Sequence, residues 1–158
     1  MAGTTIYRTA VLPEWIDYNG HLRDAYYAVA VSAAIDELMD RIGLDAAYRA
    51  RSKCTLYSLE MHLHWLHEVH ASDTLEIDAH VLGADKKRLH LGLDVRAIGR
   101  SEVAATAEIM LLHVRQGEKP GAAPFPDHVL AAIDALKPAA EAPPWPGPVS
   151  RALLLGKR

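Results

Sequence analysis

An acidic side chain, an amide and an imidazole occur close together in residues 15–27, which read WIDYNGHLRDAYY. Asp17, Asn19 and His21 stand at alternate positions in this segment. Gly20 lets the backbone turn tightly beside them. Asp and Asn side chains also stabilise ordinary turns by hydrogen bonding to the backbone two residues on, so the residue types alone leave a simple turn open.

A helix that begins just after this loop would give the acidic group a chemical role. A helix N-terminus carries unpaired backbone N–H groups and a partial positive charge. Such groups stabilise the negative charge that develops on an oxygen during acyl transfer. A carboxylate a few residues upstream adds a base or a nucleophile, so one short segment could transfer an acyl group to water.

The hydrophobic pattern predicts the elements that position this loop. Residues 4–11 are rich in β-forming types and predict a strand. Asp24 is the expected N-cap of a long helix that ends at Gly43, because its carboxylate can accept a first-turn N–H. Residues 25–34 are apolar almost all the way round, which is typical of a buried helix. A second short helical turn is expected over residues 45–51.

After the helices, the period of the apolar residues changes to two. Residues 59–65 alternate between apolar and polar types and predict a half-buried strand. Residues 74–82, 88–98 and 102–115 predict three more strands, and short polar turns suggest that all four form a meander of antiparallel hairpins. The sheet and the apolar helix can cover each other's apolar surfaces, so we expect an α+β fold in which the sheet wraps the helix.

The C-terminal part of the chain has a different composition. Eight of the nine prolines lie at or after Pro120. We therefore expect one domain over residues 1–137, which ends in a surface helix over residues 126–137, and a Pro-rich tail over residues 138–158. Residues 150–155 could form a short docking segment.

Composition restricts the function classes. The length of 158 residues fits a single domain, and the net charge of −3 argues against a nucleic-acid module. A single cysteine, Cys54, excludes an internal disulfide framework. No apolar run reaches the ~18 residues of a membrane helix, and the N-terminus lacks the apolar core of a signal peptide. We expect a protein of the cytoplasm that has no membrane partner.

The pattern Asp17-x-x-Gly20-His21, followed by Tyr26 and Tyr27 in an apolar helix, resembles the hotdog-fold acyl-CoA thioesterases of the 4-hydroxybenzoyl-CoA thioesterase type. The expected order of elements also matches that fold. The resemblance implies a long buried helix wrapped by an antiparallel five-stranded sheet. It also implies a thioester hydrolase that needs no metal or cofactor, since coenzyme A is part of the substrate.

Over residues 11–129 the sequence is more closely similar to the betainyl-CoA thioesterases of carnitine breakdown. The matching pieces are WIDYNGH with DAYY, YSLEMH, DKKRLH, and ATAEIMLLH with PFP. Betainyl-CoA is accordingly the preferred substrate, and an aromatic or short-chain acyl-CoA is the alternative. Arg23 departs from the related sequences, which commonly carry Asn there.

The resemblance also implies roles for individual residues. Asp17 either attacks the thioester carbonyl or activates water, and the backbone N–H of Asp24 polarises the thioester oxygen. Asn19 and His21 fix the loop by hydrogen bonds, or His21 donates a proton directly. The resemblance further implies a homodimer or homotetramer whose sites lie between two chains.

Two further groups could take part. Glu60 and His62 share a strand face, which is either a solvated polar face or reaches the pocket of a neighbouring subunit. Lys86, Lys87 and Arg88 stand at a hairpin tip, where they either keep the turn soluble or contact the phosphates of coenzyme A.

Four histidines fall within nine residues and could suggest a metal site. The third one breaks the alternation of the strand, and no Asp or Cys completes an obvious ligand set, so we expect no metal. The four are His62, His64, His67 and His70.

Two other functions are compatible with the fold. A hotdog hydratase or dehydratase usually needs a histidine with a carboxylate in its pocket, which Asp17 and His21 could supply. A noncatalytic module that binds CoA esters would need neither.

Overall fold

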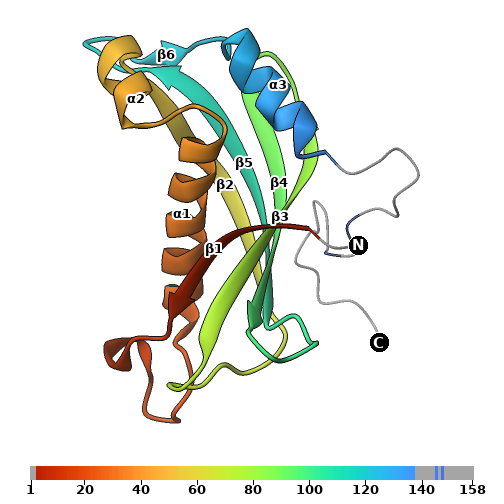
Figure 1. Cartoon of the computed structure of the whole chain (residues 1–158). Coiled ribbons are helices and arrows are strands. Elements are labelled where there is room, and N and C mark those ends of the chain that lie inside the picture. The colour runs from red at the N-terminus through yellow and green to blue at the C-terminus, as the bar shows by residue number, and fades with distance from the viewer. Residues whose placement is uncertain (1–2, 138–144, 146, 148–158) are drawn as a thin grey trace, which may run out of the picture.

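The computed structural model describes residues 3–137, 145 and 147 (Figure 1). The expected docking segment over residues 150–155, and most of the expected tail, lie outside the described residues. The elements follow one another as β1 (Thr4–Ala10), a 3-10 helix (Pro13–Trp15), α1 (Asp24–Arg41), α2 (Ala46–Ser52), β2 (Cys54–Trp65), β3 (Thr74–Ala84), β4 (Arg88–Ala97), β5 (Ala105–Arg115), β6 (Gly121–Ala122) and α3 (Asp127–Ala135).

The strands form one antiparallel sheet in the order β1-β3-β4-β5-β2, and the two-residue β6 pairs with β5. The expected meander is correct for β3, β4 and β5 but wrong for β2. Strand β2 pairs with β5, from Cys54 opposite Arg115 to Trp65 opposite Ala105. Two consecutive strands must pair as a hairpin only when the connection between them is very short. Residues 66–73 are long enough to carry the chain to the other side of the sheet, where β3 pairs with β1.

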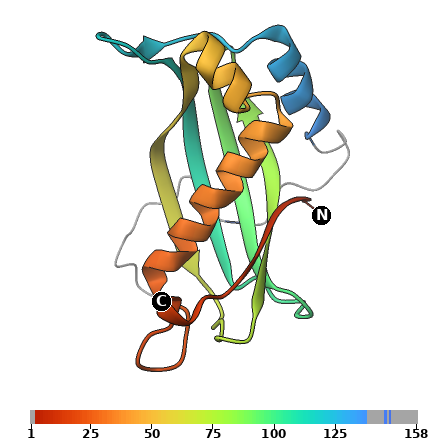
Figure 2. The ribbon, with the colours of Figure 1, turned by 60° about the vertical axis from the view of Figure 1, so that its left-hand side comes forward.

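Helix α1 lies along one face of the curled sheet, which confirms the α+β fold that the sequence predicted (Figures 1 and 2). Its buried residues recur at helical spacing and join the single core. The expected burial on all sides is wrong within this chain, since Val29 is 47% exposed. The buried residues of α1 are Tyr27, Ala30, Val31, Ala34, Ile35, Leu38 and Met39.

The expectation that Asp24 caps α1 is also wrong. Arg23 is the N-cap, and Asp24 is the first helical residue, whose carboxylate accepts the Ala25 N–H at 2.8 Å. The reason lies in the backbone before the helix. The extended Arg23 donates its N–H to the Trp15 carbonyl at 3.0 Å, so the helix can begin only after it.

The sheet face that points away from α1 is polar, in keeping with the alternation along the strands. At its centre His80 Nε2 lies 3.1 Å from Asp94 Oδ2, and Trp145 Nε1 donates to Asp94 Oδ1 at 2.8 Å. All three side chains are buried. No described helix is long and apolar enough to cross a membrane.

Candidate active site

The chain between β1 and α1 folds into a tight loop closed by backbone hydrogen bonds. The Asp17 N–H donates to the His21 carbonyl at 2.8 Å, and the Arg23 N–H closes the loop at the Trp15 carbonyl. The Arg23 guanidinium adds bonds of 3.3 and 3.4 Å to the Ile16 carbonyl. The arginine that departs from the related sequences therefore fastens the loop to the helix start.

The Asp17 carboxylate accepts hydrogen bonds from its own loop. Oδ1 accepts the Asn19 N–H at 2.8 Å and the His21 N–H at 3.1 Å. The hydrogen bond from the His21 backbone is the main cause that holds the pKa of Asp17 below its ordinary value. Asn19 and His21 thus support the carboxylate through backbone N–H groups rather than through side chains.

The start of α1 opens into a cavity of about 310 Å³. The backbone N–H of Asp24 donates to no acceptor among the described residues, as expected of the first helical residue. Asp17 does not line this cavity, but His21, whose N–H holds Asp17, does. The cavity is lined by His21, Leu22, Asp24, Tyr27, Trp65, Leu66, His67 and Glu68.

One phenol in the cavity is unsuited to act as a base. Tyr27 is buried, and this burial raises its pKa to about 12. Its hydroxyl therefore stays protonated at neutral pH and can only donate or accept a hydrogen bond.

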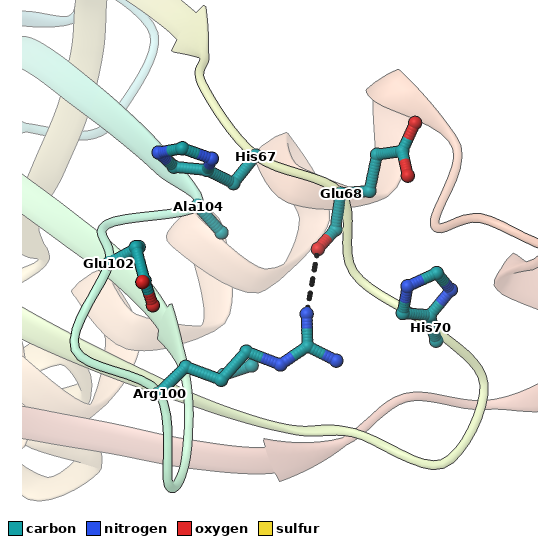
Figure 3. A pocket seen from close by; sticks show the side chains of 7 residues that line it. His67, Glu68, His70, Arg100, Glu102 and Ala104 are labelled. Atoms are coloured by element: carbon teal, nitrogen blue, oxygen red, sulfur yellow. Dashed lines mark hydrogen bonds between the residues drawn. The ribbon is translucent and has the colours of Figure 1, made fainter.

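A second cavity, of about 360 Å³, lies on the other side of the segment that follows β2 (Figure 3). Arg100 spans this cavity and donates to the Glu68 carbonyl at 3.2 Å. The same guanidinium holds both carboxylate oxygens of Asp73, at 2.9 and 3.0 Å. The segment between β2 and β3 is thereby fixed to the turn after β4.

The structure brings the Asp17 loop next to residues that no sequence motif linked to it. His21 Nε2 lies 3.2 Å from Glu68 Oε2, and its ring meets that of His70 edge-on, with centroids 5.0 Å apart. Trp65 and Glu68 line the cavity at the helix start. These residues come from far along the chain, so no local pattern could have assigned them to the site.

Glu60 and His62 belong to a different cavity, of about 90 Å³, that they share with His90 and Glu108. His62 Nε2 lies 2.8 Å from Glu60 Oε1, and His90 Nε2 lies 2.7 Å from Glu108 Oε1. These side chains are apart from the Asp17 loop in this chain.

Lys86, Lys87 and Arg88 lie at the β3–β4 turn, at the other end of the sheet from Asp17. The Asp17 loop follows Ala10, which pairs with the first residue of β3, whereas the three cations follow its last residue. A strand rises about 3.3 Å per residue, so the length of β3 separates the two sites by roughly 35 Å.

The basic turn also has a fixed geometry of its own. The Asp85 carboxylate accepts the N–H groups of Lys87 and Arg88 and binds the Arg88 guanidinium. These hydrogen bonds lower the pKa of Asp85 to about 2, and the one from the Lys87 N–H contributes most. Arg88 is therefore already paired, and the side chains of Lys86 and Lys87 are exposed.

The chain is similar to known proteins over most of its length. The family model of the thioesterase-like superfamily matches residues 11–133. A betainyl-CoA thioesterase of Pseudomonas aeruginosa is 46% identical over 149 residues, which are 94% of this chain and 93% of that protein.

Two solved structures are similar over nearly the whole chain. A Pseudomonas putida KT2440 protein assigned as a thioesterase is 39% identical, with a TM-score of 0.78, and the match covers 98% of this chain and 99% of that one. A Staphylococcus aureus protein solved in complex with CoA is 25% identical, with a TM-score of 0.86, and the match covers 99% and 98%.

Proposed function

The chain belongs to the thioesterase-like superfamily and is a thioester hydrolase, and from this premise we propose that it hydrolyses a small acyl-CoA, in the first place betainyl-CoA, to the free acid and CoA. One observation carries the proposal. An ionised carboxylate, Asp17, precedes a helix whose first N–H, that of Asp24, is unused. The identity to the betainyl-CoA thioesterase favours hydrolysis over hydration and over simple binding of a CoA ester.

In the proposed reaction the Asp24 N–H donates a hydrogen bond to the thioester oxygen. Asp17 either attacks the carbonyl carbon, which gives a mixed anhydride that water hydrolyses, or removes a proton from the attacking water. In both routes the C–S bond breaks, the acyl group gains a water oxygen, and the CoA sulfur takes up a proton. Removal of one oxyanion donor typically costs about 10²–10³ in rate.

Replacement of the carboxylate tests the proposal directly. Asp17→Asn can still accept the loop hydrogen bonds but is neither a base nor a good nucleophile, so we expect kcat to fall at least about a hundredfold. Asp36→Asn, which changes an exposed carboxylate of α1, is the control. Thiol release is measured with a thiol-reactive dye, and circular dichroism verifies the fold. A near-normal kcat for Asp17→Asn would exclude Asp17 as the catalyst.

The choice of betainyl-CoA is supported by the charges around the helix start. Asp24 and Glu68 bring two carboxylates to the cavity, and Trp65 brings an indole that is 53% exposed. Carboxylates and aromatic faces attract a quaternary ammonium group. The acyl group of betainyl-CoA carries such a group one carbon from the carbonyl, close to where the Asp24 N–H would hold the oxygen.

A neutral substrate of the same shape separates charge from size. In 3,3-dimethylbutanoyl-CoA, carbon replaces the nitrogen of betainyl-CoA. We expect kcat/KM for betainyl-CoA to exceed that for the neutral analogue by about tenfold or more. Glu68→Gln is expected to reduce this ratio, whereas Glu102→Gln, which changes a carboxylate of the neighbouring cavity, leaves it unchanged. Equal rates for the two substrates in the wild-type protein would contradict the betainyl assignment but not the hydrolase.

The proposal includes a homodimer that pairs along β2. Within the described residues β2 has no strand on its outer edge, and large apolar side chains are exposed along it and on α1. An antiparallel second copy would bring its own Lys86 and Lys87 to the end of the sheet where the first copy holds Asp17. The phosphates of CoA would then meet cations of the partner. The exposed apolar side chains on α1, on β2 and directly after β2 are those of Val29, Tyr57, Leu59, Trp65 and Leu66.

A further inference from the structure

Three possible metal ligands converge beside the Asp17 loop. His21 and His70 face each other as an isolated antiparallel bridge, so their side chains leave the backbone on the same side. Glu68 stands two residues before His70 and shares that side in an extended chain. One ligand atom from each of the three residues lies within 4.8 Å of the other two.

The two segments that supply these ligands are held in place. The Leu22 N–H donates to the carbonyl of the fully buried Val69 at 2.8 Å. The His70 N–H donates to Asp73 Oδ2 at 2.8 Å, and Arg100 binds both Asp73 and the Glu68 carbonyl. The backbone segments that carry the three ligands are therefore held in place before any ion binds, which lowers the entropic cost of binding.

We propose that His21, Glu68 and His70 form a binding site for a divalent transition-metal ion, in the first place Zn²⁺. Two imidazoles and one carboxylate are a common zinc ligand set, which leaves a fourth position for water. The histidines are partly buried, whereas the Glu68 side chain is 68% exposed, so an ion can enter from solvent. His21 was absent from the histidine run that the sequence indicated.

The site would act on the neighbouring cavity through its charge. Glu68 lines that cavity, and an ion bound to its carboxylate would cancel the negative charge offered to a cationic acyl group. Zinc would accordingly inhibit hydrolysis of betainyl-CoA more than that of the neutral analogue. This effect on activity rests on the proposed function, but zinc binding itself does not.

Binding is tested on the full chain without a histidine tag. The protein is treated with EDTA, dialysed and titrated with ZnCl₂ by isothermal titration calorimetry, and bound zinc is counted by mass spectrometry. We expect about one ion per chain, with a Kd of about 10 µM or tighter. His70→Ala and Glu68→Gln each remove one ligand, so each weakens binding by at least roughly tenfold.

His67→Ala is the matched control. His67 is exposed and stands next to Glu68 in sequence, but its ring lies apart from the Glu68 carboxylate and the His70 ring (Figure 3). We expect this variant to bind zinc as tightly as the wild-type protein. Co²⁺ offers a second readout, because its visible absorption bands report the ligands and would change in His70→Ala.

Two results would overturn the proposal. One is the lack of saturable binding by the wild-type protein in this range. The other is binding that His70→Ala and Glu68→Gln leave unchanged, which would indicate zinc on unrelated surface histidines. Glu68→Gln alters an exposed side chain, so a loss of binding in that variant cannot be attributed to unfolding. Neither result depends on whether the protein hydrolyses betainyl-CoA.

Discussion

The charge state of Asp17 is set by the backbone of its own loop. Two N–H groups point at one carboxylate oxygen, and they favour the ionised form over the protonated form. The other oxygen, Oδ2, has no hydrogen-bond partner in the part of the chain that the structure describes. The loop therefore leaves one carboxylate oxygen available to water or to a thioester.

This arrangement predicts the acid limb of the pH profile. A catalytic carboxylate works while it is ionised, and its lowered pKa keeps it ionised to lower pH than usual. We expect the loss of kcat/KM that comes from protonation of Asp17 to occur only below the ordinary range of a carboxyl group, about pH 4. In Asp17→Glu the longer side chain does not accept the same two bonds, so this acid limb moves to higher pH. An acid limb at the same pH in the wild-type protein and in Asp17→Glu would contradict the assignment of Asp17.

At the scale of elements, the loop and the start of α1 form one unit. The Gly20 N–H donates to the Asp17 carbonyl at 3.1 Å, and Gly20 has a φ of +83°. A side chain at this position would meet no atom within 4 Å, so the only cost of adding one is backbone strain.

Gly20→Ala therefore tests whether the shape of the loop matters for the chemistry. We expect it to cost about 1 kcal/mol in the free energy of unfolding and to lower kcat/KM, because strain shifts the N–H groups that hold Asp17. Gly99→Ala is the control, since Gly99 has a φ of +87°, lies in open space and stands in the turn after β4. Its loss of stability, measured by urea unfolding, should be similar. A loss of kcat/KM as large as that of Gly20→Ala would argue against a specific role of the loop.

At the scale of the whole molecule, the chain leaves its longest strand uncovered. Strand β2 has twelve residues and stands at the edge of the sheet. A long apolar edge strand invites pairing with another chain. Helix α1 also exposes an apolar side chain, since Val29 is 47% exposed in a stretch, residues 25–34, that is apolar apart from Ser32.

A charge placed on this edge is expected to weaken the proposed dimer. Leu59 is 55% exposed in β2, and Leu59→Lys would place two like charges at the proposed interface. Multi-angle light scattering should show a dimer for the wild-type protein and a shift toward monomer for this variant. We also expect KM for acyl-CoA to rise, because each site would lose the cations of its partner. Ile98→Lys is the control at a side chain that is 50% exposed outside this edge. A monomeric wild-type protein would contradict the proposal.

The sequence alone determined the order of the elements and the acidic loop before the helix. Both are local properties, since hydrophobic period, turn residues and helix formation are set by neighbours a few residues apart. Asp17, Gly20 and His21 could therefore be assigned to one loop in advance. The sequence predicts the N-cap at Asp24, but the N-cap is Arg23, because the hydrogen bond from the Arg23 N–H to the Trp15 carbonyl fixes where the helix begins.

Only the tertiary structure decided what surrounds that loop. It placed β2 beside β5 and put the basic turn at the far end of the sheet. It also brought Trp65 and Glu68 to the helix start and His70 to the side of His21. Such contacts join residues separated by many others along the chain. They depend on which strands pair and on where a connection crosses the sheet, and a local pattern of residue types carries no information about either.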